Sequence, residues 1–240
     1  MKRILSTLLL LLSCSAYANS DGIELEEADI NLSDTLSLER GAQHYVTYCL
    51  GCHSAKQIRY KRIALDLHLD ETEILKNVAP IGAGIYDQMH SAMNGHDAEK
   101  WFGTTPPDLS LIARSRGADW LYTYLKGFYT DKSKPTGVNN SVFKDVAMPN
   151  VFWQQQGTQV AVIKNIDGQD VLTDLHLEQP GQLSPKEFDK MVNDLVNFLV
   201  YVGEPVQLER QSMGKYVLFF ILMFIAVGYL LKKEYWKDVH

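Results

Sequence analysis

The chain has 240 residues, 46% of them apolar and 22% charged, with a formal net charge of -6. This composition supports a packed core and excludes a wholly disordered chain. The acidic balance and the lack of a Lys/Arg-rich run argue against nucleic acid as a partner. Three cysteines are too few for a disulfide-stapled scaffold.

The N-terminus has the pattern of a signal peptide over residues 1–18. Lys2 and Arg3 precede the apolar residues 4–12, and Ala16-Tyr17-Ala18 provides a small-residue cleavage site. A short membrane anchor and a lipoprotein site at Cys14 are the alternatives. Cleavage after Ala18 leaves 21 basic and 29 acidic residues, a net charge of -8, and only two cysteines.

Residues 19–205 form the predicted exported domain. The domain begins with an acidic loop over residues 20–34, and apolar spacing predicts helices over 38–48, 70–78, 86–101 and 119–128.

A Cys-x-x-Cys-His motif follows the first predicted helix. Cys49 and Cys52 are spaced to place two sulfurs on one turn, where each can form a thioether to a haem vinyl group, and His53 can then bind the iron. Gly51 leaves room for the porphyrin. A zinc half-site needs a second cysteine pair, and a dithiol redox pair does not require the histidine, so haem c is the predicted cofactor.

Haem iron has a second axial position, which a thioether fills in electron carriers. Met148 precedes the stiffening Pro149 in a predicted loop and is the first candidate. Met89 and Met93 are spaced as core residues of the predicted 86–101 helix, and these two or a histidine remain alternatives. His44 lies one turn before the motif on the same predicted helix, and His68, His90, His96 and His176 lack a paired ligand pattern.

Residues 106–110 (Pro-Pro-Asp-Leu-Ser) form a stiff extended segment. A proline carbonyl here, with Pro107 as the candidate, can accept a hydrogen bond from a ligand histidine and fix its ring. A simple loop before a helix is the alternative. Arg114 and Arg116 follow, and each is suited either to a haem propionate or to a surface ion pair.

The C-terminal third contains a hairpin and two helices. Residues 159–166 and 169–175 are β-prone runs around an Asp-Gly turn. Residues 184–202 carry a Ser-x-x-Glu capping box, Pro185 at the first helical position and one apolar face. The predicted fold class is therefore mainly α, a c-type cytochrome domain with a small β-hairpin insertion and one C-terminal transmembrane helix.

Residues 206–240 form the predicted membrane anchor. The apolar stretch 213–231 is about 28 Å long as a helix, close to the hydrocarbon thickness of a bilayer. Lys232, Lys233 and Lys237 follow it, so the positive-inside rule places the short tail in the cytoplasm. The signal peptide independently places the domain in the periplasm, on a single-pass protein of the bacterial inner membrane.

Taken in order, these features resemble cytochrome c1, the haem c subunit of the cytochrome bc1 complex. The resemblance covers the mature chain and is carried by the haem motif, the Pro-Pro-Asp-Leu-Ser run, residues 114–120, Met148-Pro149 and the anchor. It implies that His53 and Met148 are axial ligands, that Arg116 neutralises a propionate and that Trp120 lies close to the haem. Asn150 stands where many members have a second proline.

The resemblance also implies one-electron relay without substrate chemistry on this chain. The Rieske iron–sulfur protein would be the donor, a soluble or membrane-bound cytochrome c the acceptor, and cytochrome b the partner of the anchor alongside inner-membrane lipid. The acidic residues 21–34 would attract a basic cytochrome c, or form only a solvated terminus. A stand-alone membrane-anchored monohaem cytochrome is the alternative, and an enzyme or gas sensor with an open iron is a further one.

Overall fold

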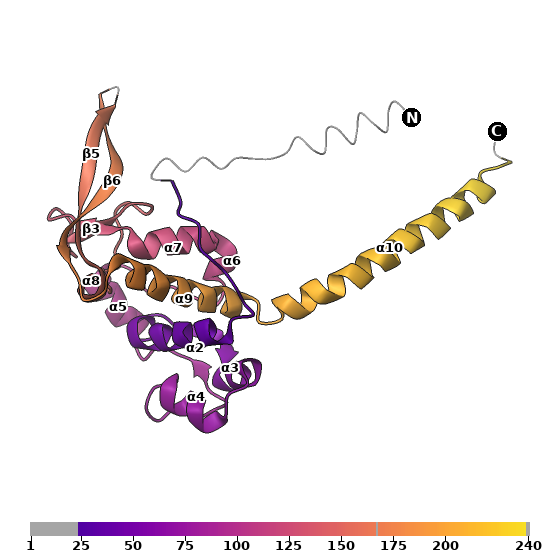
Figure 1. Ribbon diagram of the computed structural model, residues 1–240, viewed down its shortest axis with the longest axis horizontal. Helices are drawn as coiled ribbons and strands as arrows, with labels where there is room; N and C mark the ends of the chain where they lie inside the picture. The colour runs from indigo at the N-terminus through magenta and orange to yellow at the C-terminus, as the bar shows by residue number, and fades with distance from the viewer. Residues whose placement is uncertain (1–23, 167, 239–240) are drawn as a thin grey trace.

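A computed structural model of the protein describes residues 24–166 and 168–238 (Figure 1). The predicted signal peptide and Cys14 lie outside the described residues. The described chain forms a helical domain with three two-stranded antiparallel sheets, followed by a long helix that projects away from the domain. The predicted mainly α fold class is confirmed.

The helices are α2 (Thr35–His44), the π-helix η1 (Tyr45–Cys49), α3 (Tyr60–Leu67), α4 (Glu71–Asn77), α5 (Gly95–Phe102), α6 (Ile112–Arg116), α7 (Ala118–Lys126), α8 (Trp153–Gln156), α9 (Pro185–Gly203) and α10 (Gln207–Tyr235). The strands are β1 (Ala55–Arg59), β2 (Gln88–Met89), β3 (Phe128–Thr130), β4 (Val138–Asn140), β5 (Gly157–Ile166) and β6 (Gln169–Pro180).

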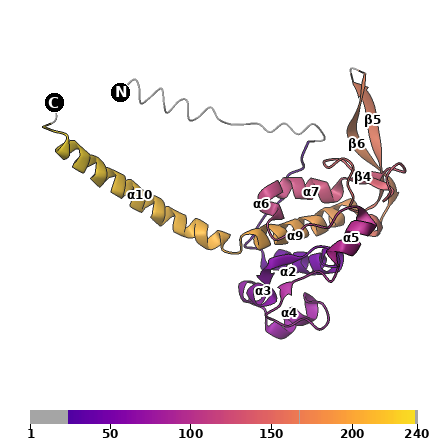
Figure 2. The same cartoon turned by 180° about the vertical axis from the view of Figure 1, so that it is seen from behind.

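The core is built on α9, which lies beside α2 and α7 in both ribbon views (Figures 1 and 2). Ser184 caps α9 and forms the predicted capping box with Glu187. Its apolar face is buried against α2, since Val192, Leu195 and Phe198 are at most 1% exposed. The two helices approach closely because α2 carries Gly41 at the crossing, where a Cβ atom would lie 2.7 Å from the Phe198 Cβ.

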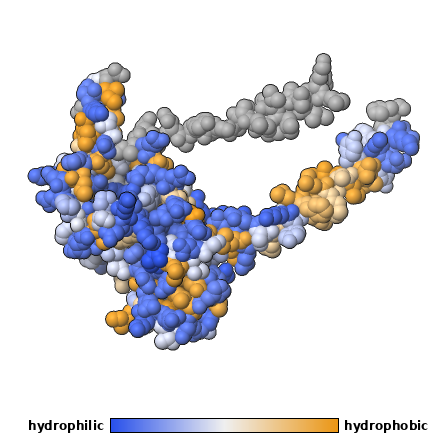
Figure 3. Space-filling view, in the orientation of Figure 1, coloured by the Kyte–Doolittle hydropathy of each residue, from blue (hydrophilic) through white to orange (hydrophobic). Residues whose placement is uncertain are grey.

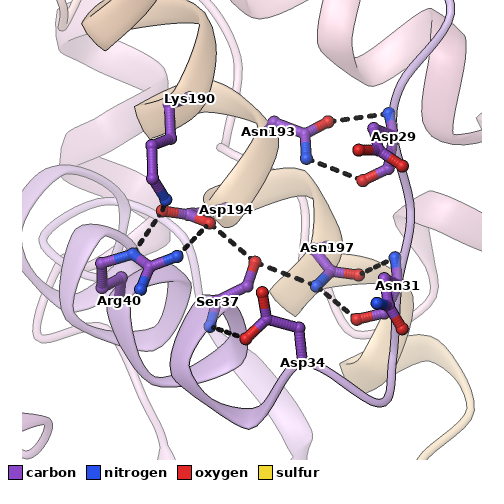
Figure 4. Close-up of polar contacts among 9 residues, drawn as sticks. All are labelled: Asp29, Asn31, Asp34, Ser37, Arg40, Lys190, Asn193, Asp194 and Asn197. Atoms are coloured by element: carbon purple, nitrogen blue, oxygen red, sulfur yellow. Dashed lines mark hydrogen bonds and ion pairs between the residues drawn. The ribbon is translucent and has the colours of Figure 1, made fainter.

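A polar cluster on α9 fastens the N-terminal part of the chain (Figure 4). Asp194 accepts hydrogen bonds from Ser37 at 2.7 Å and from Arg40 at 2.6 and 2.9 Å. Asn193 and Asn197 each accept from and donate to the backbone of the extended segment before α2, at Asp29 and Asn31. The predicted 20–34 loop is thus held against α9 at Asp29 and Asn31, and its Glu26 and Ala28 amides donate to side chains of α7.

Two predicted segments differ from the structure. The expected helix over 86–101 is replaced by strand β2 and the shorter helix α5, because Met89 pairs with Ala55 and Asn94 caps α5 by accepting from the His96 amide. The tertiary pairing with β1 overrides the helical spacing of the apolar residues. The hairpin is confirmed but longer, with Ile166 opposite Gln169 and Gly168 at φ +84°.

The last helix, α10, runs from Gln207 to Tyr235 and is the one described helix that is long and apolar enough to cross a membrane. None of its apolar window is buried within the chain. Apolar side chains cover its middle, and polar side chains cover both ends (Figure 3). This arrangement agrees with the predicted anchor.

Candidate functional site

The Cys-x-x-Cys-His motif begins where the first helix changes its winding. The chain passes from α2 into the π-turn η1, closed by a bond from the Leu50 amide to the Tyr45 carbonyl at 2.9 Å. The amides of Cys52 and His53 then both donate to the Cys49 carbonyl, at 3.0 and 2.8 Å. π-turns recur at functional sites, and this one brings both thiols, which are free, onto a single turn.

His53 is held by the predicted proline segment. Its Nδ1 lies 2.8 Å from the Pro107 carbonyl oxygen. A carbonyl can only accept, so Nδ1 carries the hydrogen and Nε2 is the nitrogen left for a metal. The contact predicted from the Pro-Pro-Asp run is therefore present, and it fixes the tautomer and the ring orientation.

The proline segment is itself fastened to the chain after the motif. The Leu109 amide donates to the Ser54 carbonyl at 2.8 Å, and the Asp108 carboxylate accepts from the Lys56 amide at 3.1 Å. The Ser110 hydroxyl accepts from the Gln57 amide at 3.1 Å. Together these bonds make residues 107–110 a rigid strap along one side of the motif.

Burial sets the electrostatics of the motif. It raises the pKa of Cys49 to about 12 and also raises the pKa of Cys52. A redox dithiol needs a depressed thiol pKa, so this environment disfavours that alternative. Burial also lowers the pKa of His53, against the opposing effects of Pro107 and Asp108, which favours the neutral imidazole that binds metals. Among the described residues, no three His, Cys, Asp or Glu side chains converge in a way that could hold a metal ion.

A second group of residues ends at Met148. The guanidinium of Arg116 lies over the Trp120 ring, 5.0 Å from its centroid. Trp120 stacks on Tyr124 with centroids 4.9 Å apart and an interplanar angle of 11°. The Tyr124 hydroxyl then lies 3.4 Å from the Met148 sulfur. The structure thus brings Arg116, Trp120 and Met148 into one cluster, through a tyrosine that the sequence prediction missed.

An aromatic contact connects the two groups. Tyr48 precedes Cys49 directly, and its ring packs edge-on against Phe152, four residues after Met148, with centroids 5.2 Å apart. Phe152 is fully buried and packs in turn on Phe188 of α9. The turn that carries the thiols and the loop that carries the thioether therefore rest on the same part of the core.

The other candidates have different surroundings. Met89 is fully buried opposite Ala55, as a core residue is. Met93 is half-buried, and its amide donates to the hydroxyl of Ser91. The same hydroxyl donates to the Gly51 carbonyl within the motif. Arg114 forms an ion pair with Glu204 at 3.4 Å, at the junction with α10, whereas Arg116 joins the aromatic cluster.

Sequence reasoning missed three supporting residues besides the π-turn. The Tyr45 hydroxyl donates to the His53 carbonyl at 2.8 Å. Ser91 donates from its hydroxyl to the Gly51 carbonyl and from its amide to the Ser54 hydroxyl, both at 2.9 Å. Tyr124 lies one helical turn after Trp120, and that spacing is the signal that could have identified it.

This set of donors fits a covalently attached haem. It comprises two free thiols on one turn, a histidine with only Nε2 left for a metal, and a thioether held beside aromatic rings. The fold, the apolar helix α10 and this set of donors are those expected of a membrane-anchored c-type cytochrome.

Comparison with known proteins specifies the family. Residues 82–239 match the Cytochrome C1 family, a range that includes Pro107, Arg116 and Met148 but begins after the cysteine motif. Cytochrome c1 of Allochromatium vinosum is 48% identical over all of this chain and 99% of its own length. A protein of Nitrosomonas europaea named ammonia monooxygenase gamma subunit is 44% identical over the full length of both chains.

A chain in a solved structure of a hyperthermophilic respiratory complex III aligns with 98% of this chain and 94% of its own, at a TM-score of 0.45 and 18% identity. The assignment rests on the sequence matches: the chain belongs to the cytochrome c1 family. It is an electron-transfer subunit of the respiratory cytochrome bc1 complex, and the family carries covalently bound haem c.

Proposed function

We propose that this chain would hold one haem c through thioethers to Cys49 and Cys52, and that His53 and Met148 would bind its iron. The observation that carries the proposal is the hydrogen bond between His53 and Pro107, because it leaves a single ring nitrogen available on a side chain next to two free thiols. A haem held there supplies a one-electron redox couple. The protein attaches it, orients His53, shields it from water and provides the cation of Arg116 for a propionate.

The proposed partners follow from family membership. The Rieske iron–sulfur protein is the electron donor, a cytochrome c is the acceptor, and cytochrome b packs on the anchor helix. The domain lies in the periplasm after removal of the signal peptide 1–18, and the tail that follows α10 lies in the cytoplasm. Three lysines after the apolar stretch support this orientation.

Haem attachment can be tested directly. The full chain is produced in cells that attach c-type haem, and the pigment is extracted with acidified acetone. We expect the colour to stay with the wild-type protein and with a His44→Ala control, and to become extractable or absent in a Cys49→Ala, Cys52→Ala double variant. Extraction of the colour from the wild-type protein would refute covalent attachment.

Co-purification distinguishes a subunit of a cytochrome bc1 complex from the alternative of a stand-alone membrane-anchored cytochrome. A tag on the C-terminus is used to purify the protein from detergent-solubilised membranes of its native cell. We expect a subunit with b-type haem to co-purify, whereas a stand-alone cytochrome would be isolated without one.

The same C-terminal tag tests the orientation in the membrane. Protease added to spheroplasts should cleave the periplasmic domain while the cytoplasmic tag stays intact, and loss of the tag would contradict this orientation.

A further inference from the structure

The hydroxyl of Tyr124 is directed at the sulfur that the site offers to iron. The oxygen lies 3.4 Å from the Met148 Sδ, which is within hydrogen-bond range for a sulfur acceptor. A thioether sulfur has two lone pairs. A hydrogen bond to one of them leaves the second free, so this contact and metal binding are compatible.

The donor is fixed in place by its neighbours. Trp120 stacks on one face of the Tyr124 ring, and Phe128 contacts it edge-on with centroids 5.3 Å apart. The Asn140 side chain donates to the Tyr124 carbonyl at 2.8 Å and ties this end of α7 to strand β4. The ring therefore cannot turn its hydroxyl away from Met148 without disrupting two aromatic contacts.

The direction of the contact is set by the chemistry of its two ends. The phenol hydroxyl of Tyr124 carries a hydrogen that it can donate. The thioether sulfur has no hydrogen and can only accept. Tyr124 is therefore the donor and Met148 the acceptor.

We propose that Tyr124 is a positioning residue that raises the redox potential of this cytochrome by donating a hydrogen bond to the Met148 sulfur; this rests on the proposed ligation by Met148. The hydrogen bond draws electron density from the sulfur and makes it a weaker donor. An oxidised iron needs that donation more than a reduced one does, so the contact favours the reduced state. It also restrains the thioether against leaving the metal.

The test is a redox titration of the haem-loaded full chain carrying Tyr124→Phe. Phenylalanine keeps the ring that Trp120 and Phe128 enclose and removes only the hydroxyl, so the fold is expected to persist. At a fixed potential we expect the ratio of oxidised to reduced protein to rise about three- to tenfold, which lowers the midpoint potential by about 28 to 59 mV. Tyr122→Phe is the matched control, since that buried hydroxyl on the same helix contacts Lys126 instead.

Two readouts keep this inference separate from the proposed ligand. If Met148 is not the ligand, the charge-transfer band of a methionine-bound oxidised haem is absent from the wild-type protein or survives Met148→Ala. If the band is present and depends on Met148, yet Tyr124→Phe and Tyr122→Phe both keep the wild-type potential, the ligand stands and the role of Tyr124 is wrong. A lower potential in Tyr124→Phe alone supports it.

Discussion

The Nδ1 of His53 and the carbonyl oxygen of Pro107 lie 2.8 Å apart, although 54 residues separate them in the chain. The contact depends on the strap formed by residues 107–110, which is bonded in turn to the backbone at Ser54 and Lys56. The orientation of His53 is therefore set by a segment from another part of the sequence. Substitutions in residues 107–110 should alter the position of the His53 ring even though the Cys-x-x-Cys-His motif itself is unchanged.

Asp108→Ala tests the strap. The variant loses the acceptor for the amides of Lys56 and Ser110, at 3.1 and 2.9 Å. Because the aspartate is exposed and water can replace part of what is lost, we expect about 1 kcal/mol of destabilisation in a urea titration. Glu27→Ala, at another exposed acid, should change the free energy of unfolding by less than about 0.5 kcal/mol. Equal midpoints for the two variants would show that the strap contributes nothing.

Asp194→Asn tests the polar cluster between α2 and α9. The Asp194 side chain is 6% exposed and accepts from Ser37, Arg40 and Lys190 (Figure 4). The amide retains shape and loses charge, and Arg40 is exposed enough to be rehydrated. We therefore expect a loss of about 1–3 kcal/mol at neutral pH, measured by denaturant unfolding.

The same variant predicts a pH dependence with a definite sign. Burial alone would raise the pKa of Asp194, but the hydrogen bonds from Arg40, Ser37 and Lys190 outweigh it and hold the pKa below its ordinary value. The carboxylate thus adds stability that is complete above its unfolded pKa of about 3.9 and is lost as the pH falls through the folded value. The difference in the free energy of unfolding between wild type and Asp194→Asn should become smaller below about pH 4. A difference in the free energy of unfolding that stays constant as the pH falls would show that the charge of Asp194 does not stabilise the cluster.

Gly41→Ala tests the close crossing of α2 and α9. The added methyl group would overlap the Asp194 backbone carbonyl and lie 2.7 Å from the Phe198 Cβ, so the helices must move apart. We expect a loss of about 1–3 kcal/mol in thermal or denaturant unfolding, as for other overpacked cores. In contrast, a methyl group at Gly214 would meet no heavy atom within 4 Å among the described residues outside the adjacent part of its own helix, so Gly214→Ala should leave the domain's stability unchanged. Wild-type stability of Gly41→Ala would mean that the two helices are not tightly packed there.

Local chemistry explains what the sequence could predict. The capping box at Ser184 and the uncharged run before Lys232 each depend on residues close together in the chain. The ends of α9 lie within one residue of the prediction, whereas α10 begins six residues before the predicted span 213–231 and ends four residues after it. Strand β2 was missed because it exists only through its pairing with Ala55 in β1. The residues of the site likewise fall into those with a local sequence signature and those brought together only by the fold. The haem motif and the proline acceptor have sequence signatures, whereas the contact from Tyr124 to Met148 joins a helix to a distant loop.

The two arginines of α6 make the last prediction, because each can serve as the control for the other. Arg114 pairs with Glu204, which also binds Arg210 at the start of α10, so this arginine ties the domain to its anchor. Arg114→Gln should therefore speed proteolytic cleavage at residues 203–210 and leave the redox potential unchanged.

Arg116 should behave in the opposite way. Its guanidinium lies 5.0 Å from the Trp120 centroid and 6.0 Å from that of Phe143, in the cluster that holds Met148. If it provides positive charge for a haem propionate, Arg116→Gln removes a charge that opposes oxidation of the iron. We expect the midpoint potential to fall by up to about 59 mV, a tenfold change in the redox equilibrium, with cleavage of the junction unaltered. An unchanged potential would assign Arg116 to the aromatic cluster alone, and a fall in Arg114→Gln as well would show that the two arginines are not functionally separate.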